Sequence, residues 1–171
     1  FLTAFLQMNM TNDEVAYKQL LADIGDGYLD SYLLNFAAAR LTHALGKNDL
    51  TLNILENRPA DQGKFSFYYL DYLQGMSLLY KLDFEKSKQY FNRFLKNFKG
   101  NNYIKSTYHK LAWIAFLQGE TDKTQSYFKQ VISEGSGVID EDKVALKDAK
   151  KQYTTHSRLL NTRLLYDGGY Y

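Results

Sequence analysis

The chain has 171 residues, 45% of them hydrophobic and 23% charged, enough for one domain with a sizeable core. Its 21 basic and 19 acidic residues leave a net charge of +2, which gives no argument for a polyanionic partner. The absence of cysteine excludes disulfides and Cys-based metal or redox sites, and no run reaches the ~18–20 apolar residues that span a bilayer.

The first part of the chain predicts two helix pairs. We expect residues 1–25 to form one pair, after which the sequence GDG at 25–27 breaks the chain. Residues 31–59 form another, with a turn at Gly46 and an end at Pro59. Because proline breaks helices and this is the only one in the chain, we expect an all-α fold.

The middle of the chain repeats itself with a shift of 37 residues. Superposed positions are Asp71 and Tyr108, Gly75 and Ala112, Phe84 and Thr121, Ser87 and Thr124, Phe91 and Phe128, and Phe94 and Val131. Apolar residues recur every three or four positions in each unit, which predicts helix–turn–helix units over residues 67–99 and 103–134. We expect the small residues to lie where the two helices of a unit approach closely.

An additional helix is predicted over residues 140–152. Asp140 is placed to cap it, Glu141 and Asp142 lie in its first turn, and lysines follow in later turns, which suits the helix dipole. The sequence IDEDKVA begins like a calcium-binding loop but lacks the later oxygen ligands and the central glycine. We therefore interpret the acidic residues as a cap and a complement to the dipole.

Residues 156–171 predict the start of a further unit, in which Gly168 takes the position of Gly119. An unpaired first helix would expose its apolar side. That side consists of Leu160, Leu164 and Leu165. We therefore expect the chain to be an excerpt of a longer protein, with this helix frayed or in contact with a neighbouring molecule.

These units resemble the tetratricopeptide repeat (TPR), a helix–turn–helix unit of about 34 residues. The matching residues are Gly75, Phe84, Ser87, Phe91, Tyr108, Leu111, Ala112, Gly119, Thr124 and Phe128. Leu82 departs from the pattern at the turn position that glycine usually holds. The resemblance implies an all-α, right-handed superhelix of antiparallel helix hairpins, a TPR-like α-solenoid, as one domain over residues 1–171.

The chain also resembles aromatic-rich bacterial TPR-like proteins, which share segments such as NFKGNNYIK (97–105) and IDEDKVALK (139–147). Such relatives are commonly longer and often exported. The resemblance therefore favours an exported location, periplasmic or in the cell envelope, over a cytoplasmic one.

In TPR-like stacks, the first helix of each pair lines the concave side, and its side chains are candidates for contacting a partner. Those candidates are Phe36, Arg40, His43, Tyr69, Tyr72, Met76, Tyr80, His109, Trp113, Phe116 and Arg158. Tyrosine and tryptophan offer large, rigid contact areas, and Arg40 suits a carboxylate. The alternative is that these rings pack one repeat on the next or against the additional helix.

No motif for phosphate binding, dinucleotide binding, zinc-protease or serine-hydrolase chemistry occurs, and the three histidines fall in different units. We therefore expect no catalytic activity, no metal and no cofactor. The favoured function is a scaffold that binds a protein or peptide on its concave face.

Two alternatives stay open. The repeats would support a catalytic or ligand-binding domain elsewhere in the parent chain, or they would bind nucleic acid through lysine-rich faces. Those faces consist of Lys96, Lys99, Lys105 and Lys110, and of Lys143, Lys147, Lys150 and Lys151. Acidic residues are nearly as numerous, which favours solvated faces over nucleic-acid binding.

Overall fold

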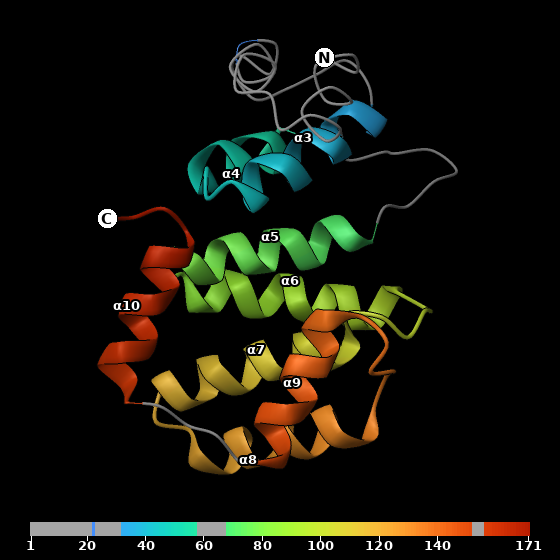
Figure 1. Ribbon diagram of the computed structural model, residues 1–171, viewed down its shortest axis with the longest axis vertical. Coiled ribbons are helices and arrows are strands. Elements are labelled where there is room, and N and C mark those ends of the chain that lie inside the picture. Colours follow the sequence, from blue (N-terminus) through green and yellow to red (C-terminus); the bar gives the residue numbers. More distant parts are fainter. Residues whose placement is uncertain (1–21, 23–31, 58–67, 152–155) are drawn as a thin grey trace. The chain divides into compact units, whose positions relative to one another are not determined.

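A computed structural model describes residues 22, 32–57, 68–151 and 156–171 (Figure 1). The chain divides into two compact units, residues 1–67 and 68–171. The described residues form eight helices and no strand, so the all-α prediction is confirmed for them. The predicted helix pair over residues 1–25 lies outside the described residues, apart from residue 22.

The described part of the first unit forms a helix hairpin, α3 (Tyr32–Ala44) and α4 (Asn48–Glu56). The turn between them has Gly46 at φ 67°, the left-handed conformation that glycine adopts without steric cost. The two helices are joined inside by a hydrogen bond of 2.9 Å between the hydroxyls of Thr42 and Thr51.

The second unit contains two helix hairpins that lie within the predicted ranges 67–99 and 103–134. They are α5 (Tyr69–Tyr80) with α6 (Phe84–Asn97), and α7 (Ile104–Leu117) with α8 (Thr121–Ser133). The turn residues occupy matching positions, because Leu82 at φ 60° stands where Gly119 has φ 75°. Leu82 thus adopts a left-handed conformation that is uncommon for a branched side chain.

The small residues of the first of these hairpins let α5 and α6 approach closely, as predicted. A Cβ added to Gly75 would lie 2.7 Å from the ring of Phe91, which is closer than real Cβ contacts. The Ser87 hydroxyl donates to the Gly75 carbonyl at 2.7 Å. Asp71, which replaces the aromatic residue of the repeat pattern, forms an ion pair with Arg93 of α6 through two hydrogen bonds of 2.9 and 2.5 Å.

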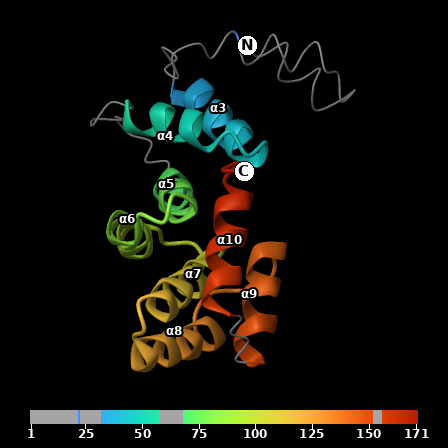
Figure 2. The ribbon, with the colours of Figure 1, turned by 90° about the vertical axis from the view of Figure 1, so that its left-hand side faces the viewer.

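Two further helices complete this unit, α9 (Asp140–Lys150) and α10 (Ser157–Asp167). α9 packs on α7 and α8, and α10 packs against α5 (Figure 2). A small apolar cluster holds α7, α8 and α9 together. Its buried members are Ala112, Phe128, Val131, Ala145 and Ala149.

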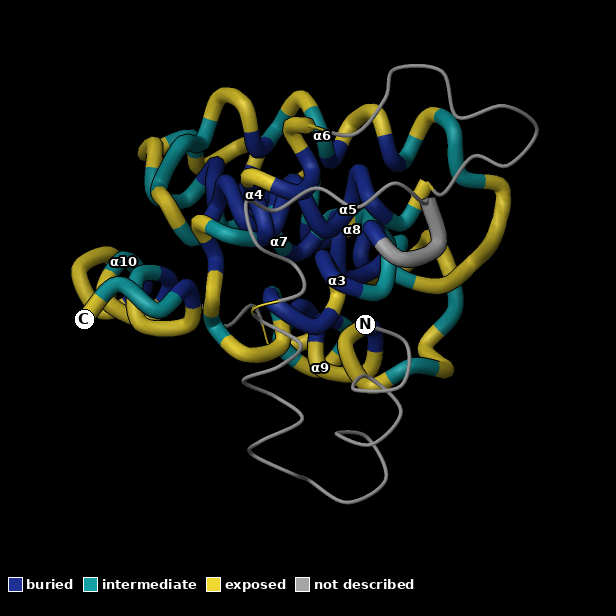
Figure 3. The backbone as a smooth tube through the Cα atoms, turned by 90° about the horizontal axis from the view of Figure 1, so that it is seen from above, coloured by how far each residue is buried: buried dark blue, intermediate teal, exposed yellow. Residues whose placement is uncertain are grey.

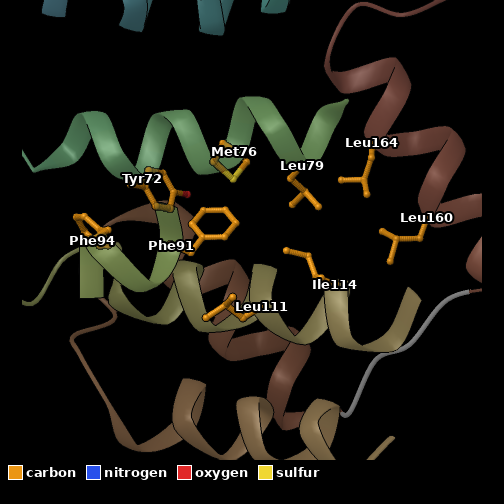
Figure 4. Close-up of a cluster of buried hydrophobic side chains, with 9 residues drawn as sticks. All are labelled: Tyr72, Met76, Leu79, Phe91, Phe94, Leu111, Ile114, Leu160 and Leu164. Carbon is orange, nitrogen blue, oxygen red and sulfur yellow. The ribbon is translucent and has the colours of Figure 1, made fainter. Parts of the chain in front are cut away.

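The expected exposure of the last helix is wrong. Leu160 and Leu164 are 2% and 0% exposed, because they pack into the core beside Leu79 of α5 and Ile114 of α7 (Figure 4). Gly168 does not provide the left-handed turn residue either, since its φ is −84° and that of Gly169 is 81°. Gly168 instead permits close packing, because a Cβ there would lie 2.7 Å from the Cβ of Tyr80.

The main core of the second unit lies between α5, α6, α7 and α10 (Figure 4). Its buried members are Tyr72, Met76, Leu79, Phe91, Phe94, Leu111, Ile114, Leu160 and Leu164. Figure 3 shows α5 buried along most of its length, whereas α6 alternates between buried and exposed turns. The sequence accounts for this difference, because α5 is apolar on most sides and α6 carries one apolar stripe.

Candidate functional site

The candidate positions on the first helices differ in exposure. Tyr72, Met76 and His109 are buried, Arg40 and Arg158 are exposed, and Phe36, His43, Tyr69, Tyr80, Trp113 and Phe116 are half-buried. The set therefore contains interior side chains as well as surface ones, and only the half-buried and exposed members present atoms to a partner.

Tyr72 is an interior residue that joins three helices. Its hydroxyl forms a hydrogen bond of 2.8 Å with the Ser106 hydroxyl of α7. Its ring centroid lies 6.0 Å from that of Phe91 and 5.7 Å from that of Phe94, both on α6. Burial raises the pKa of Tyr72 well above its usual value, so the phenol stays neutral and acts as a packed, hydrogen-bonded core group.

His109 is also an interior residue, 2% exposed and packed between two rings. Its ring centroid lies 4.7 Å from that of Trp113 and 6.2 Å from that of Phe128. Burial, together with the positive charges of Lys110 and Arg163, lowers the pKa of His109 to about 3. The imidazole is therefore neutral at physiological pH, and the 3.7 Å between its Nε2 and Asp148 Oδ2 is too long for a hydrogen bond.

Trp113 is half-buried and has two cationic side chains at its ring. Lys110 Nζ lies 3.6 Å from the ring centroid, and Cζ of Arg163 from α10 lies 5.5 Å from it. Both distances are within the range of cation–π attraction. The repeat pattern by itself places Trp113 on α7 but says nothing of Arg163. Arg163 reaches the ring of Trp113 because it belongs to α10, which packs beside α7.

Phe116 lies one turn beyond Trp113 and borders a hollow of about 250 Å³ at the α7–α8 turn. The other lining residues are Gly119, Thr121, Thr124 and Gln125. The hollow is smaller than the ~300–1,000 Å³ typical of small-molecule pockets. Its size suits a single side chain of a partner.

The tyrosines of α5 lie against neighbouring parts of their own unit. The ring centroid of Tyr69 is 5.7 Å from that of Tyr72 and 4.8 Å from that of Tyr103. Burial raises the pKa of Tyr80 to about 12, and the charge of Asp167 on α10 adds to this shift. In the first unit, burial lowers the pKa of His43 to about 4.

Asp142 lies in the first turn of α9, as predicted, but sequence reasoning missed its contact with α7. The predicted cap by Asp140 is wrong, because α9 begins at Asp140 and has no side-chain cap. The Asp142 carboxylate is fully buried and accepts hydrogen bonds from the backbone N–H groups of Tyr103 at 2.7 Å and Ser106 at 2.8 Å. A residue of α9 therefore caps the N-terminus of α7, instead of complementing its own helix alone. Burial raises the pKa of Asp142, whereas the two backbone hydrogen bonds act in the opposite direction.

Lys105 was likewise assigned to a surface lysine face, but it is 5% exposed. Its ammonium donates to the carbonyls of Val131 at 2.8 Å and Ile132 at 3.2 Å, at the C-terminal end of α8. A buried lysine that binds the last carbonyls of a neighbouring helix is a structural group, because its charge complements the negative end of the dipole.

Within the described ranges, no group of three or more His, Asp or Glu side chains is arranged to hold a metal ion. In the same part of the chain, no helix combines the length and apolar character needed to cross a membrane.

Comparison with known proteins identifies the two hairpins of the second unit. A tetratricopeptide-repeat family model matches residues 69–101 and 107–134, the first covering α5 and α6 and the second α7 and α8. Neither the curated proteins nor the solved structures gave a match. With the paired helices and the shared turn positions, these two matches show that the second unit contains two TPR-like helical repeats.

Proposed function

We propose that this chain is a non-catalytic scaffold for protein–protein interaction, and that a partner segment contacts an aromatic surface on α7. TPR repeats generally mediate protein–protein interactions. We define the α7 aromatic surface as Trp113, Phe116 and Leu117, which are all half-buried.

The observation that carries this proposal is the contrast within the first helices. Tyr72 and His109 have their surfaces covered by the chain itself, whereas Trp113 and Phe116 keep part of each ring accessible. Half-exposed aromatic rings on a rigid helix are the side chains that most often dominate binding free energy. The hollow beside Phe116 adds a place for a partner side chain.

Arg158 extends the surface toward charged partners. It lies in the first turn of α10 and is exposed; its backbone N–H donates to His156 Nδ1 at 3.3 Å, and its carbonyl accepts from the Thr162 hydroxyl at 2.9 Å. Its guanidinium suits a carboxylate of the partner segment. Arg40, Phe36 and His43 belong to the first unit and stay in the proposal as a separate contact region.

Nucleic-acid binding is less favoured than protein binding, because several lysines of the proposed faces have structural partners. Lys105 is buried against α8, Lys99 donates to the Lys96 carbonyl at 3.2 Å, and Lys143 pairs with Asp140 at 2.9 Å.

Support of a domain elsewhere in a longer chain is compatible with the scaffold proposal. Export from a bacterial cell, which the resemblance favours, is part of the proposal and is testable by cell fractionation.

Site-specific photo-crosslinking tests the proposed surface. A photoreactive amino acid at position 116 should crosslink a protein partner in cells, whereas the same group at exposed position 89 on α6 should not. Phe116→Ala should weaken the purified interaction about tenfold. The matched control Ile132→Ala removes a 49% exposed apolar side chain from α8 and should change nothing.

Two measurements make the outcome decisive. Because Phe116 packs partly against the core, Phe116→Ala is compared with the unmodified chain at a temperature well below its melting temperature, where equal helical circular dichroism shows that lost binding is not lost folding. Binding should persist between low and high salt, because the proposed contacts are largely apolar. Equal effects of the two alanine variants would contradict the surface, and steep loss of binding with salt would favour a polyanion.

A further inference from the structure

The helix α9 follows the second repeat and lies outside both stretches that the family model matches, the later of which ends at residue 134. Its inner side packs on α7 and α8 through the buried side chains of Ala145 and Ala149. Its outer side carries lysines at positions 143, 147, 150 and 151, a spacing that places all four on one face. Core packing does not account for this row, because all four lysines are exposed.

These lysines border a hollow of about 400 Å³ on the outer side of α9. We define the α9 lysine surface by the residues that line it, which are Lys143, Leu146, Lys147, Lys150 and Lys151. Leu146 is half-buried, and each lysine has an apolar stem that ends in a charged group. The hollow therefore combines apolar walls with four ammonium groups.

The charges of this surface are only partly balanced by the chain itself. Lys143 pairs with Asp140 at 2.9 Å. Within the part of the chain that the structure describes, the ammonium groups of Lys147, Lys150 and Lys151 form no ion pair or hydrogen bond. Lysines in the last turn complement the helix dipole, but this effect leaves their ammonium groups in solvent. Three positive charges beside an apolar hollow are thus available to an anionic ligand.

The dimensions and charges of α9 favour a short acidic peptide segment over a nucleic acid or a membrane. The helix has 11 residues and is about 16 Å long, the span of about five extended residues. Its first turn carries the exposed carboxylates of Asp140 and Glu141, which repel an extended anionic surface such as a DNA duplex or an anionic bilayer. The hollow admits an apolar side chain, for which phosphate groups have no counterpart.

We propose that the α9 lysine surface binds an acidic segment of a partner protein. An apolar side chain of that segment enters the hollow beside Leu146, and the carboxylates on either side of it pair with Lys147, Lys150 and Lys151. This surface shares no residue with the α7 aromatic surface, so the proposal does not depend on the function proposed for α7.

Fluorescence anisotropy on the full chain tests the proposal. The probe is a labelled hexapeptide in which a leucine–phenylalanine pair is flanked by two glutamates on each side. The combined changes Lys147→Gln, Lys150→Gln and Lys151→Gln should weaken its binding about tenfold, because three ion pairs are lost together. An unchanged affinity would overturn the proposal.

A matched control removes the same number of charges from other helices. The combined changes Lys86→Gln, Lys96→Gln and Lys129→Gln affect exposed lysines of α6 and α8, and should leave the affinity within about twofold, because salt screens distant charges. Equal weakening by the two sets would show that the peptide responds to net charge alone, which contradicts a defined surface.

Two altered peptides test the surface on the unmodified chain, so that the result does not depend on the folding of any variant. Glutamines in place of the glutamates should abolish binding, and alanines in place of the leucine–phenylalanine pair should weaken it several-fold, because the hollow is then unfilled. Equal affinity of the alanine peptide and the parent would contradict the role of the hollow. Tighter binding of phosphatidylglycerol vesicles or duplex DNA than of the hexapeptide would assign the surface to an extended polyanion and overturn the proposal.

Discussion

The two repeats of the second unit superpose with a shift of 37 residues, but they carry different side chains at the superposed interior positions. In the first repeat, α5 is buried at every position from Asp71 to Leu79, whereas α7 of the second repeat keeps Trp113 and Phe116 half-buried. The shift of 37 residues places His109 where the first repeat has Tyr72. The second repeat thus has an imidazole at an interior position where the first has a phenol, while the buried carboxylate of the first repeat, Asp71, is paired with Arg93.

This difference affects how each repeat responds to change. A phenol or a leucine inside a helix pair does not titrate in the physiological range, so Tyr72 adds no acid sensitivity to the first repeat. The second repeat has His109 inside and depends on Asp142 and Lys105 to terminate its helices. Three substitutions test whether packing dominates in one repeat and charge in the other.

The largest effect should come from Phe91→Ala in the first repeat. Its ring is fully buried and fills the space that Gly75 leaves open on α5, so truncation creates a cavity that costs about 3–5 kcal/mol. Phe128→Ala at the equivalent position should cost less, because Ala112 already has a methyl group there. Urea unfolding of both variants measures this ranking, and a larger loss for Phe128→Ala would reverse the comparison.

An intermediate effect should come from Asp142→Ala. The change leaves the backbone N–H groups of Tyr103 and Ser106 without their acceptor, which costs about 2–3 kcal/mol. Asp140→Ala is the matched control, because that side chain is 91% exposed and pairs only with Lys143 on the same helix. Its effect should stay within about 0.5 kcal/mol. Equal losses in chemical unfolding would show that the cap on α7 is unimportant.

The smallest effect should be the acid sensitivity caused by His109. Because the folded pKa of about 3 lies below the ordinary 6.5, the unfolded chain binds a proton in this range that the folded chain does not. The stability that His109 confers is therefore complete above pH 6.5 and is lost as the pH falls, by about 2 kcal/mol at pH 5.

His109→Phe should flatten this pH dependence, since phenylalanine fits among the surrounding rings and does not titrate. Unfolding free energies of the two proteins at pH 7 and pH 5 give the difference directly, because His43 and the carboxylates titrate equally in both. Identical slopes would mean that His109 is exposed to solvent in the folded state.

Much of the fold follows from local patterns that the sequence displays. The period of the apolar residues predicted the helices α5 to α8, and the small residues Gly75 and Ser87 predicted where α5 and α6 approach closely. The turn at Leu82 followed from the register, although its left-handed conformation is unusual for leucine. These features depend on residues within one repeat, where the spacing of residues along the chain determines how the two helices and their turn are arranged.

The features that sequence reasoning missed depend on contacts between distant segments. Leu160 and Leu164 looked unpaired because nothing in their own helix indicates that α10 packs against α5. The target of Asp142 lies 36 to 39 residues away on another helix. One signal was available for the contact of Lys110 with Trp113, since the shift of 37 residues superposes Lys110 on the buried Leu73.

The cap that Asp142 forms also bears on how the chain opens. Because the amides of Tyr103 and Ser106 are held by a carboxylate from α9, they exchange with solvent hydrogen only when α9 detaches or the start of α7 unwinds. α9 and the second repeat should therefore open together as one cooperative segment, with similar exchange rates at these amides and inside α9. A helix that lies outside the repeat pattern is in this way part of the repeat's folding unit.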